Sequence, residues 1–318
     1  MKKLLNTFCI LALSVSSIAY AEIVDSPVDN KSTYHINDKI ELISAHDVQY
    51  EKPKIMIKMV YPKLSSDDSA EEAIKKTADN DDSGDENNIA QENSPGSSVN
   101  AFNEEVTKII TEEISYFKQR VADAQDFQQT LDKAKIKNRL TIDYNSAVMN
   151  LEDQPIISIR FVMQAYVTGM AHPYRRYRTI NFDLDAGAPI ELSQLFDPSS
   201  NYLETLATIA NTNLAKKIRV DAMLAGGAAP TPDNYRNWNI NPNGLRITFD
   251  EATVAPYVYG SQTVLIPYSA LKTLINPESA LGRCLEHRRR CMRDPLLTGG
   301  FIDEAANTKH RRLNPALG

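Results

Sequence analysis

Cysteine is scarce in this chain of 318 residues, which contains three. Cys9 lies in the apolar N-terminal run, so Cys284 and Cys291 are the pair left for the remainder of the chain. Small exported domains that depend on disulfides need several pairs, and two cysteines exclude that class of scaffold. In a helix these two residues would lie ~10 Å apart, too far to bridge, so a disulfide between them would require a turn.

Positive charge is also in short supply. The formal net charge is −6, and residues 65–98 carry ten acidic residues against two lysines. The eight Lys and Arg residues after residue 282 form a basic tail, residues 283–318, which we expect to be poorly ordered. No concentrated basic face suited to nucleic acid is visible, and we expect no nucleic-acid partner.

Signals of catalysis are missing as well. The five histidines are scattered without metal-ligand spacing. The sequence has no Gly-x-Ser-x-Gly elbow, no His-Glu-x-x-His pair and no phosphate-binding glycine loop. We therefore expect no catalytic residue, no metal site and no cofactor.

Long apolar runs are absent except at the N-terminus. There, Lys2 and Lys3 precede an apolar run and a small-residue ending, Ala19-Tyr20-Ala21. This order is typical of a secretory signal peptide, residues 1–21, with cleavage before Glu22. An uncleaved anchor is the alternative, although the run is short against the ~20 residues that a bilayer requires. We expect an exported protein, periplasmic or secreted, with no stable membrane span after cleavage.

The acidic segment, residues 65–98, has almost no large apolar side chains. Such a segment cannot offset its ordering entropy, so it is expected to be a disordered insertion. Residues 79–85 resemble the opening of a calcium loop. The match fails at Glu86, where the loop needs an apolar residue, and at Ala90, where it needs a glutamate. A solvated acidic linker is the favoured interpretation.

The rest of the chain alternates between strand and helix patterns. Apolar residues recur every three or four positions over residues 99–133, which predicts a long amphipathic helix. A shorter helix is predicted after Asn201, through Ile218, with Glu204 completing a capping box. Alternating runs predict strands at residues 54–61, 139–149, 156–168, 176–184, 237–240, 245–249 and 264–266. The fold class is α+β: antiparallel sheets packed against the long helix and the second shorter helix, in two small associated domains.

Several motifs in the second half of the chain follow one another in a recognisable order. They are residues 166–173 (YVTGMAHP), 179–184 (TINFDL), 192–196 (LSQLF), 237–238 (NW), 249–257 (FDEATVAPY) and 260–268. Together they resemble the extracellular C-terminal domain family of the anti-sigma factor RsiV, which is also found beside the catalytic module of the peptidoglycan deacetylase PdaC. The resemblance covers about residues 140–275. Where that family usually has Gly-Ala-His, this chain has Gly169-Met-Ala-His172.

The resemblance implies a domain order. Residues 22–138 resemble the PdaC-like N-terminal companion domain, interrupted by the acidic insertion, and residues 139–282 form the RsiV C-terminal-like domain. In RsiV the domain pair is a lysozyme receptor, and beside the deacetylase it is non-catalytic. The resemblance therefore implies an exported, non-catalytic binding protein of the cell envelope, with a lysozyme-like protein or peptidoglycan as partner. Two alternatives stay open: a peptidoglycan-active hydrolase or deacetylase with an unrecognised site, and a structural envelope protein without a ligand.

The turn between two of the predicted strands carries the candidate ligand-binding residues. They are Tyr166, Thr168, His172, Tyr174, Arg175, Arg176 and Tyr177. Tyrosine and arginine are the residue types that dominate binding hot spots when they are exposed. The alternatives are that Tyr166 and Tyr177 pack on each other across the strands, and that His172 is a loop residue stacked on a neighbour.

Overall fold

The computed structural model describes residues 33–52, 54–66, 95–124, 137–151, 154–218, 221–241, 243–286 and 297–299. The predicted signal peptide, the calcium-like stretch and Cys291 lie outside these residues, as do most of the acidic segment and of the basic tail. In the part of the chain that is described, no helix is both long and apolar enough to cross a membrane.

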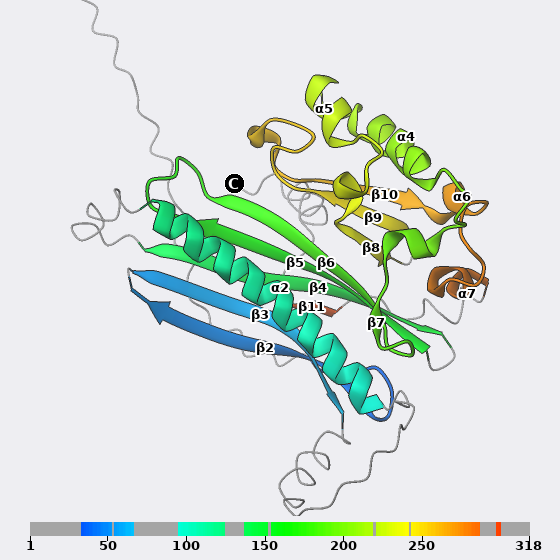
Figure 1. The fold of residues 1–318 in the computed structure, drawn as a ribbon, viewed down its shortest axis with the longest axis horizontal. Helices are drawn as coiled ribbons and strands as arrows, with labels where there is room; N and C mark the ends of the chain where they lie inside the picture. The colour runs from blue at the N-terminus through cyan, green and yellow to red at the C-terminus, as the bar shows by residue number, and fades with distance from the viewer. Residues whose placement is uncertain are drawn as a thin grey trace, which may run out of the picture. The chain divides into compact units, whose positions relative to one another are not determined.

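A large sheet forms the centre of the described fold (Figure 1). Its strands, in order across the sheet, are β1 (Thr33–His35), β2 (Ile40–Glu51), β3 (Ile55–Ser66), β4 (Asn138–Leu151), β5 (Gln154–Tyr166), β6 (Tyr174–Asp183) and β7 (Ala188–Pro189), and β11 (Leu297–Gly299) pairs with β4. The predicted α+β class is confirmed. One neighbouring pair, β3 with β4, is parallel, because the chain between them crosses the sheet face through a helix.

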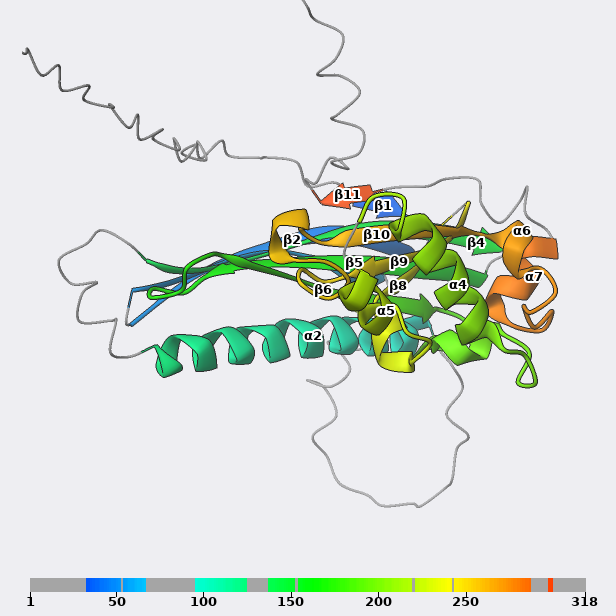
Figure 2. The same cartoon turned by 90° about the horizontal axis from the view of Figure 1, so that it is seen from above.

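That helix, α2 (Pro95–Asp123), lies along one face of the sheet (Figure 2). It begins four residues before the predicted start, and residues 125–133 of the predicted helix lie outside the described residues. Its buried apolar side chains are Val99, Phe102, Val106, Ile110, Phe117 and Val121. Phe102 meets Phe182 of β6 edge to face, with ring centroids 5.4 Å apart. Each buried side chain of this size contributes ~1.5–3 kcal/mol, so tertiary packing holds the helix in place.

Asn103 of α2 forms hydrogen bonds with the part of β3 that has no pairing with β4. Beyond Met59, β3 no longer pairs with β4. The Asn103 amide accepts a hydrogen bond from Leu64 N and donates one to Leu64 O, each over 2.9 Å. The freed backbone of β3 is therefore satisfied by a side chain, which buried peptide groups require.

A smaller, three-stranded antiparallel sheet has its own core. Its strands are β8 (Trp238–Asn241), β9 (Gly244–Phe249) and β10 (Gln262–Pro267), and the predicted hairpin is the turn between β8 and β9. The surrounding elements are η1 (Leu192–Leu195), α4 (Tyr202–Leu214), α5 (Asp221–Gly227), η2 (Pro232–Tyr235), η3 (Tyr257–Tyr259), α6 (Tyr268–Leu271) and α7 (Ala280–Glu286). At Gly244 a Cβ would lie 2.2 Å from Ile266 O, so this strand pair requires glycine there.

The start of α4 corrects one detail of the prediction. Asn201 occupies the N-cap, but its side chain makes no capping hydrogen bond. Its ψ of 51° departs from the extended backbone in which an N-cap side chain reaches the first turn, so the predicted capping box with Glu204 is wrong. Reciprocal capping is found instead at η1, where Glu191 N donates to Gln194 Oε1 over 2.6 Å.

Asn181 of β6 joins the two sheets. Its amide donates to Trp238 O over 2.9 Å and accepts from Ile240 N over 3.1 Å. The Ser158 hydroxyl, on β5, donates to the same Asn181 oxygen over 2.6 Å. Asn181 is 3% exposed, so one buried amide connects β5, β6 and β8. The division of the chain at residue 138 stays a prediction.

Asp143 of β4 makes stability depend on pH. Burial raises the pKa of its carboxyl to about 7, although the backbone N–H of Tyr144 donates to it over 2.7 Å and opposes the rise. The unfolded chain releases this proton near pH ~3.9, so the free energy of unfolding falls as the pH rises from about 4 to 7. In the parent protein, we expect the free energy of unfolding to be on the order of 2 kcal/mol lower at pH 7.5 than at pH 4.5, measured by urea unfolding. In Asp143→Asn this difference should disappear. An unchanged pH profile would contradict this assignment.

Candidate functional site

The turn between β5 and β6 is built around Gly169, whose φ of 95° is in the left-handed region that favours glycine. Met170 N donates to Val167 O over 3.1 Å and closes the turn. Thr168 N donates to Asn138 Oδ1 over 2.9 Å, which ties the turn to the start of β4. His172 and Pro173 follow this turn and directly precede β6.

A cavity of about 390 Å³ opens beside the start of β6, and we call it the β6 pocket. Its lining residues are Tyr116, Arg120, Met170, Ala171, His172, Pro173, Tyr174, Arg175, Arg176, Asp250, Glu251, Ala252 and Tyr257. They come from α2, the β5–β6 turn, β6, the turn after β9, and η3. The volume lies within the ~300–1,000 Å³ that small-molecule sites usually have.

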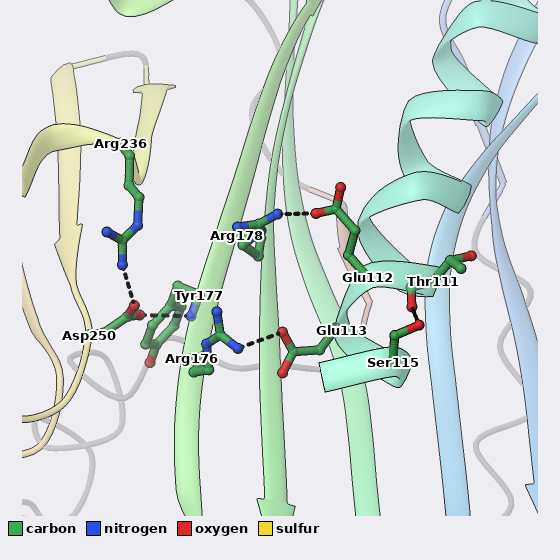
Figure 3. A network of polar contacts seen from close by, with 9 residues as sticks. All are labelled: Thr111, Glu112, Glu113, Ser115, Arg176, Tyr177, Arg178, Arg236 and Asp250. Atoms are coloured by element: carbon green, nitrogen blue, oxygen red, sulfur yellow. Dashed lines mark hydrogen bonds and ion pairs between the residues drawn. The ribbon is translucent and has the colours of Figure 1, made fainter. Parts of the chain in front are cut away.

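The wall toward α2 contains a buried ion pair. Arg176 Nη1 lies 3.4 Å from Glu113 Oε2, and the guanidinium stands over the Tyr116 ring at 4.1 Å. Glu113 is 3% exposed, and this burial raises the pKa of its carboxyl against the opposing effect of Arg176. Figure 3 shows that Arg176 and Arg178, two residues apart on β6, both point toward neighbouring glutamates of α2. Arg178 pairs with Glu112 nearer the surface.

Tyr174 lies against the same wall. Its ring meets Tyr116 edge to face, with centroids 5.9 Å apart. Its hydroxyl is buried and has no hydrogen-bond partner among the described residues. Burial raises the pKa of this hydroxyl, and the charge of Glu113 raises it further, so Tyr174 stays protonated at any physiological pH.

The opposite wall uses two carboxylates to satisfy the edge of β6. Asp250 accepts from Tyr177 N over 2.8 Å and from the Arg236 guanidinium over 3.4 Å (Figure 3). Glu251 accepts from Arg175 N over 3.0 Å. Burial raises the pKa of both carboxyl groups, and these hydrogen bonds oppose the rise. The two acids therefore stand where a further strand would otherwise pair with β6.

The mouth of the pocket is aromatic. His172 and Tyr257 stack with ring centroids 5.2 Å apart and an interplanar angle of 18°. The Tyr257 hydroxyl donates to Pro173 O over 2.5 Å, which fixes the ring, and Tyr257 is 42% exposed. Val258 and Tyr259 beside it are also exposed. His172 is thus a stacked loop residue, one of the two alternatives that the sequence left open.

The structure brings four of the seven candidate residues together and separates three. His172, Tyr174, Arg175 and Arg176 all line the β6 pocket. Tyr166 and Thr168 lie toward the start of β4, where Tyr166 pairs with Arg139. The three separated residues are Tyr166, Thr168 and Tyr177.

Tyr177 points to the other face of β6. It is 8% exposed, and its hydroxyl lies 2.9 Å from Ser261 Oγ. Its partner across the strands is Val162, so the alternative in which Tyr166 packs on Tyr177 across the strands is wrong. The difference is one of register: Tyr177 lies opposite Val162, four residues before Tyr166, and the pairing of β5 with β6 ends at Ala165.

Sequence reasoning missed the pocket residues outside the turn. They are Tyr116, Arg120, Asp250, Glu251, Ala252 and Tyr257. Residues 249–257 were singled out as part of a family pattern, which was the available signal for four of them. Tyr116 and Arg120 sit on the polar side of a helix and carried no signal of their own.

A second cavity, of about 430 Å³, lies between α2, β6 and β8. Lys108, Glu112, Arg178, Arg236 and Trp238 are among its lining residues. Its cations face acids nearby, since Lys108 pairs with Glu105 and Arg178 with Glu112. Among the residues that the structure describes, no group of three or more His, Cys, Asp or Glu side chains could hold a metal ion.

The smaller sheet and four residues of the pocket wall, Asp250, Glu251, Ala252 and Tyr257, fall in a region that matches a known family. Residues 193–269 match the model of the family described as "Protein of unknown function (DUF3298)". The C-terminal part of the chain is thus similar to the DUF3298 family, and the chain is similar to PdaC and MPT64, so the resemblance seen in the sequence is confirmed in this form. A crystal structure of a DUF3298 family member from Bacteroides fragilis aligns with 75% of this chain and 93% of its own, at 17% identity and a TM-score of 0.46.

Three curated relatives are similar to parts of the chain. Peptidoglycan-N-acetylmuramic acid deacetylase PdaC of Bacillus subtilis is 28% identical over 145 residues, 45% of this chain and 30% of that protein. Esterase Rv3036c of Mycobacterium tuberculosis is 27% identical over 106 residues, 33% and 47% of the two chains. Immunogenic protein MPT64 of the same species is 24% identical over 139 residues, 43% and 59%. The chain spans less than two thirds of the length of each relative.

Proposed function

We propose that this chain is an exported, non-catalytic binding protein of the cell envelope, and that the β6 pocket and its aromatic mouth are its contact surface. Its ligand is a lysozyme-type protein or a peptidoglycan-related glycan. The observation that carries the proposal is the convergence of His172, Arg175 and Tyr257 around one open cavity.

The residue types at the pocket support a binding role. Arginine and tyrosine side chains that are held in place by their neighbours lose little entropy on binding and dominate hot spots. Tyr257 is fixed through its hydroxyl, and Arg176 through Glu113 and Tyr116. Exposed apolar surface continues from Tyr257 into Val258, which is 85% exposed. A surface of this kind suits recognition of a partner.

The relatives and the N-terminus support the cellular setting of the proposal. One relative is named for its action on peptidoglycan. Residues 1–21 have the pattern of a signal peptide, and intact-mass measurement of the mature protein tests whether it begins at Glu22.

Binding is tested with the purified protein, hen lysozyme and insoluble peptidoglycan sacculi, by co-elution and by co-sedimentation. We expect Arg175→Ala to weaken the interaction about tenfold or more, because a hot-spot arginine is removed from the pocket. Arg246→Ala is the matched control, since Arg246 is a partly buried arginine of β9 that does not line the pocket. Absence of binding to both ligands at micromolar concentration would sink the proposal.

A peptidoglycan-active enzyme is the competing function, since two relatives are named as a deacetylase and an esterase. The same sacculi are assayed for released acetate and soluble fragments. Release that depends on His172 would favour the enzyme. A general base needs its proton donor within hydrogen-bond reach. The contact that His172 makes is a ring stack on Tyr257, which favours the binding role.

A further inference from the structure

The exposed ring of Tyr257 is a rigid flat surface at the edge of the β6 pocket. His172 stacks on it, so the open part of the ring belongs to the other face and the rim. Polarised C–H groups of a sugar ring are attracted to such a face, because an aromatic ring is electron-rich above and below its plane. Since the hydroxyl is already bound to Pro173 O, a ligand meets the ring without first ordering it.

Polar groups with hydrogen-bonding capacity surround this ring. Glu251 and Arg175 line the same cavity as Tyr257, and Arg175 N donates to Glu251 over 3.0 Å. Arg175 also donates from its guanidinium to the Gln164 amide oxygen over 3.1 and 2.7 Å, in the amide orientation that satisfies both groups. An aromatic surface flanked by fixed donors and acceptors is the arrangement that a small polar ring such as a sugar requires.

Two guanidinium groups that line the pocket, those of Arg120 and Arg175, form no ion pair among the described residues, and that of Arg175 is bound to Gln164. Asp250 and Glu251 accept hydrogen bonds from β6, and Arg176 is paired with Glu113. Arg120 is exposed and has no carboxylate partner among the described residues. Its guanidinium lies 3.9 Å from Met170 Sδ. A guanidinium without an acid partner, at the edge of a partly apolar cavity, favours an anionic group on the ligand.

We propose that the β6 pocket is a saccharide subsite that prefers a sugar carrying a carboxylate, with Tyr257 under the ring and Arg120 pairing with the carboxylate. This inference rests on the proposed binding function and selects its glycan branch. The second cavity is the weaker candidate, because its cations are paired with neighbouring acids and its Trp238 is 5% exposed.

Two sugars that differ by one group provide the probe. N-acetylmuramic acid and N-acetylglucosamine share the ring and the acetamide, and only the former carries a lactyl carboxylate. Their dissociation constants for the full protein are measured by ligand-observed NMR. We expect N-acetylmuramic acid to bind about tenfold or more tightly, the gain from one charge-assisted arginine–carboxylate contact.

Two variants, each with a matched control, test the separate roles of Arg120 and Tyr257. Arg120→Ala should abolish the preference for the acidic sugar, whereas Lys118→Ala, on the same helix and paired with Glu51, should keep it. Tyr257→Ala should weaken both sugars at least about tenfold. Tyr50→Ala should leave both unchanged, because Tyr50 of β2 is exposed, at 66%, and does not line the pocket. Thermal unfolding checks that each variant is folded.

The outcomes separate this inference from the proposed function. Equal affinity for the two sugars, or a preference that survives Arg120→Ala, overturns the acidic-sugar subsite. If neither sugar binds while lysozyme still co-elutes, the subsite is overturned and the binding function stands. If the acidic sugar binds as expected but neither lysozyme nor sacculi are retained, the subsite is supported and the envelope function fails.

Discussion

Arg176→Met is expected to lower the free energy of unfolding by about 3–5 kcal/mol at neutral pH, measured by urea denaturation. The substitution leaves the Glu113 carboxylate, which is 3% exposed, without its cation. Removing one partner of a buried ion pair costs this much because the remaining charge is neither solvated nor paired. Methionine keeps much of the apolar stem, so the loss reports on the guanidinium, which pairs with Glu113 and lies over the Tyr116 ring.

The pH dependence of this loss has a definite sign. Burial already raises the pKa of Glu113 above its ordinary value, and the loss of Arg176 raises it further. Below about pH 4 the carboxyl is protonated in both states and costs little. As the pH rises through the unfolded pKa near ~4.3, the unfolded chain ionises first and stability falls until the folded pKa is passed. The variant should therefore be closest to the parent in acid and furthest from it at neutral pH.

The chain supplies its own control for this experiment. Arg178 pairs with Glu112 one step along the same strand and helix, but the Glu112 side chain is 49% exposed. Arg178→Met should cost less than about 1 kcal/mol, because water solvates the acid that is left. Glu113→Gln combined with Arg176→Met should recover part of the loss. Equal losses for Arg176→Met and Arg178→Met would refute the buried ion pair.

Asn181→Ala is expected to cost about 3 kcal/mol or more. It removes the side chain that bonds to Trp238 O, Ile240 N and the Ser158 hydroxyl, and each buried group left unpaired costs ~1–3 kcal/mol. Trp238 is the sole tryptophan, so its fluorescence reports on the smaller sheet beside the break. We expect the midpoint of the fluorescence change to fall at a lower urea concentration in the variant than in the parent protein.

Asn213→Ala is the comparison for this variant. Its amide donates to Ile209 O within α4 and connects no two elements. Its removal should cost less than about 1 kcal/mol. If Asn181→Ala were as mild as Asn213→Ala, the hydrogen bonds of Asn181 would not be what holds the two sheets together.

The elements whose apolar residues follow a regular local spacing could be predicted from the sequence. The stripe on α2, the long strands β5 and β6 and the hairpin of β8 and β9 each follow from spacing within a few residues. Apolar periodicity says which face is buried, but it does not say which strands are neighbours. The parallel pairing of β3 with β4 depends on that choice. Periodicity also leaves the register of a hairpin open, which explains why Tyr166 does not lie opposite Tyr177.

The pocket was half predictable for the same reason. His172, Tyr174, Arg175 and Arg176 are close in sequence, and their composition indicated a contact surface. Glu113 and Asp250 meet β6 only through the tertiary fold. A glutamate on a helix gives no sign in the sequence that it will be buried, because Glu112 beside it has the same side chain and stays half exposed.

The contact surface itself is tested most directly by backbone NMR of the labelled protein during titration with solubilised peptidoglycan fragments or lysozyme. We expect the largest shift changes on residues 170–176 and 250–257, which contain most of the residues that line the β6 pocket. Changes concentrated around Lys108 and Trp238 at the second cavity, with the β6 pocket unaffected, would contradict this expectation.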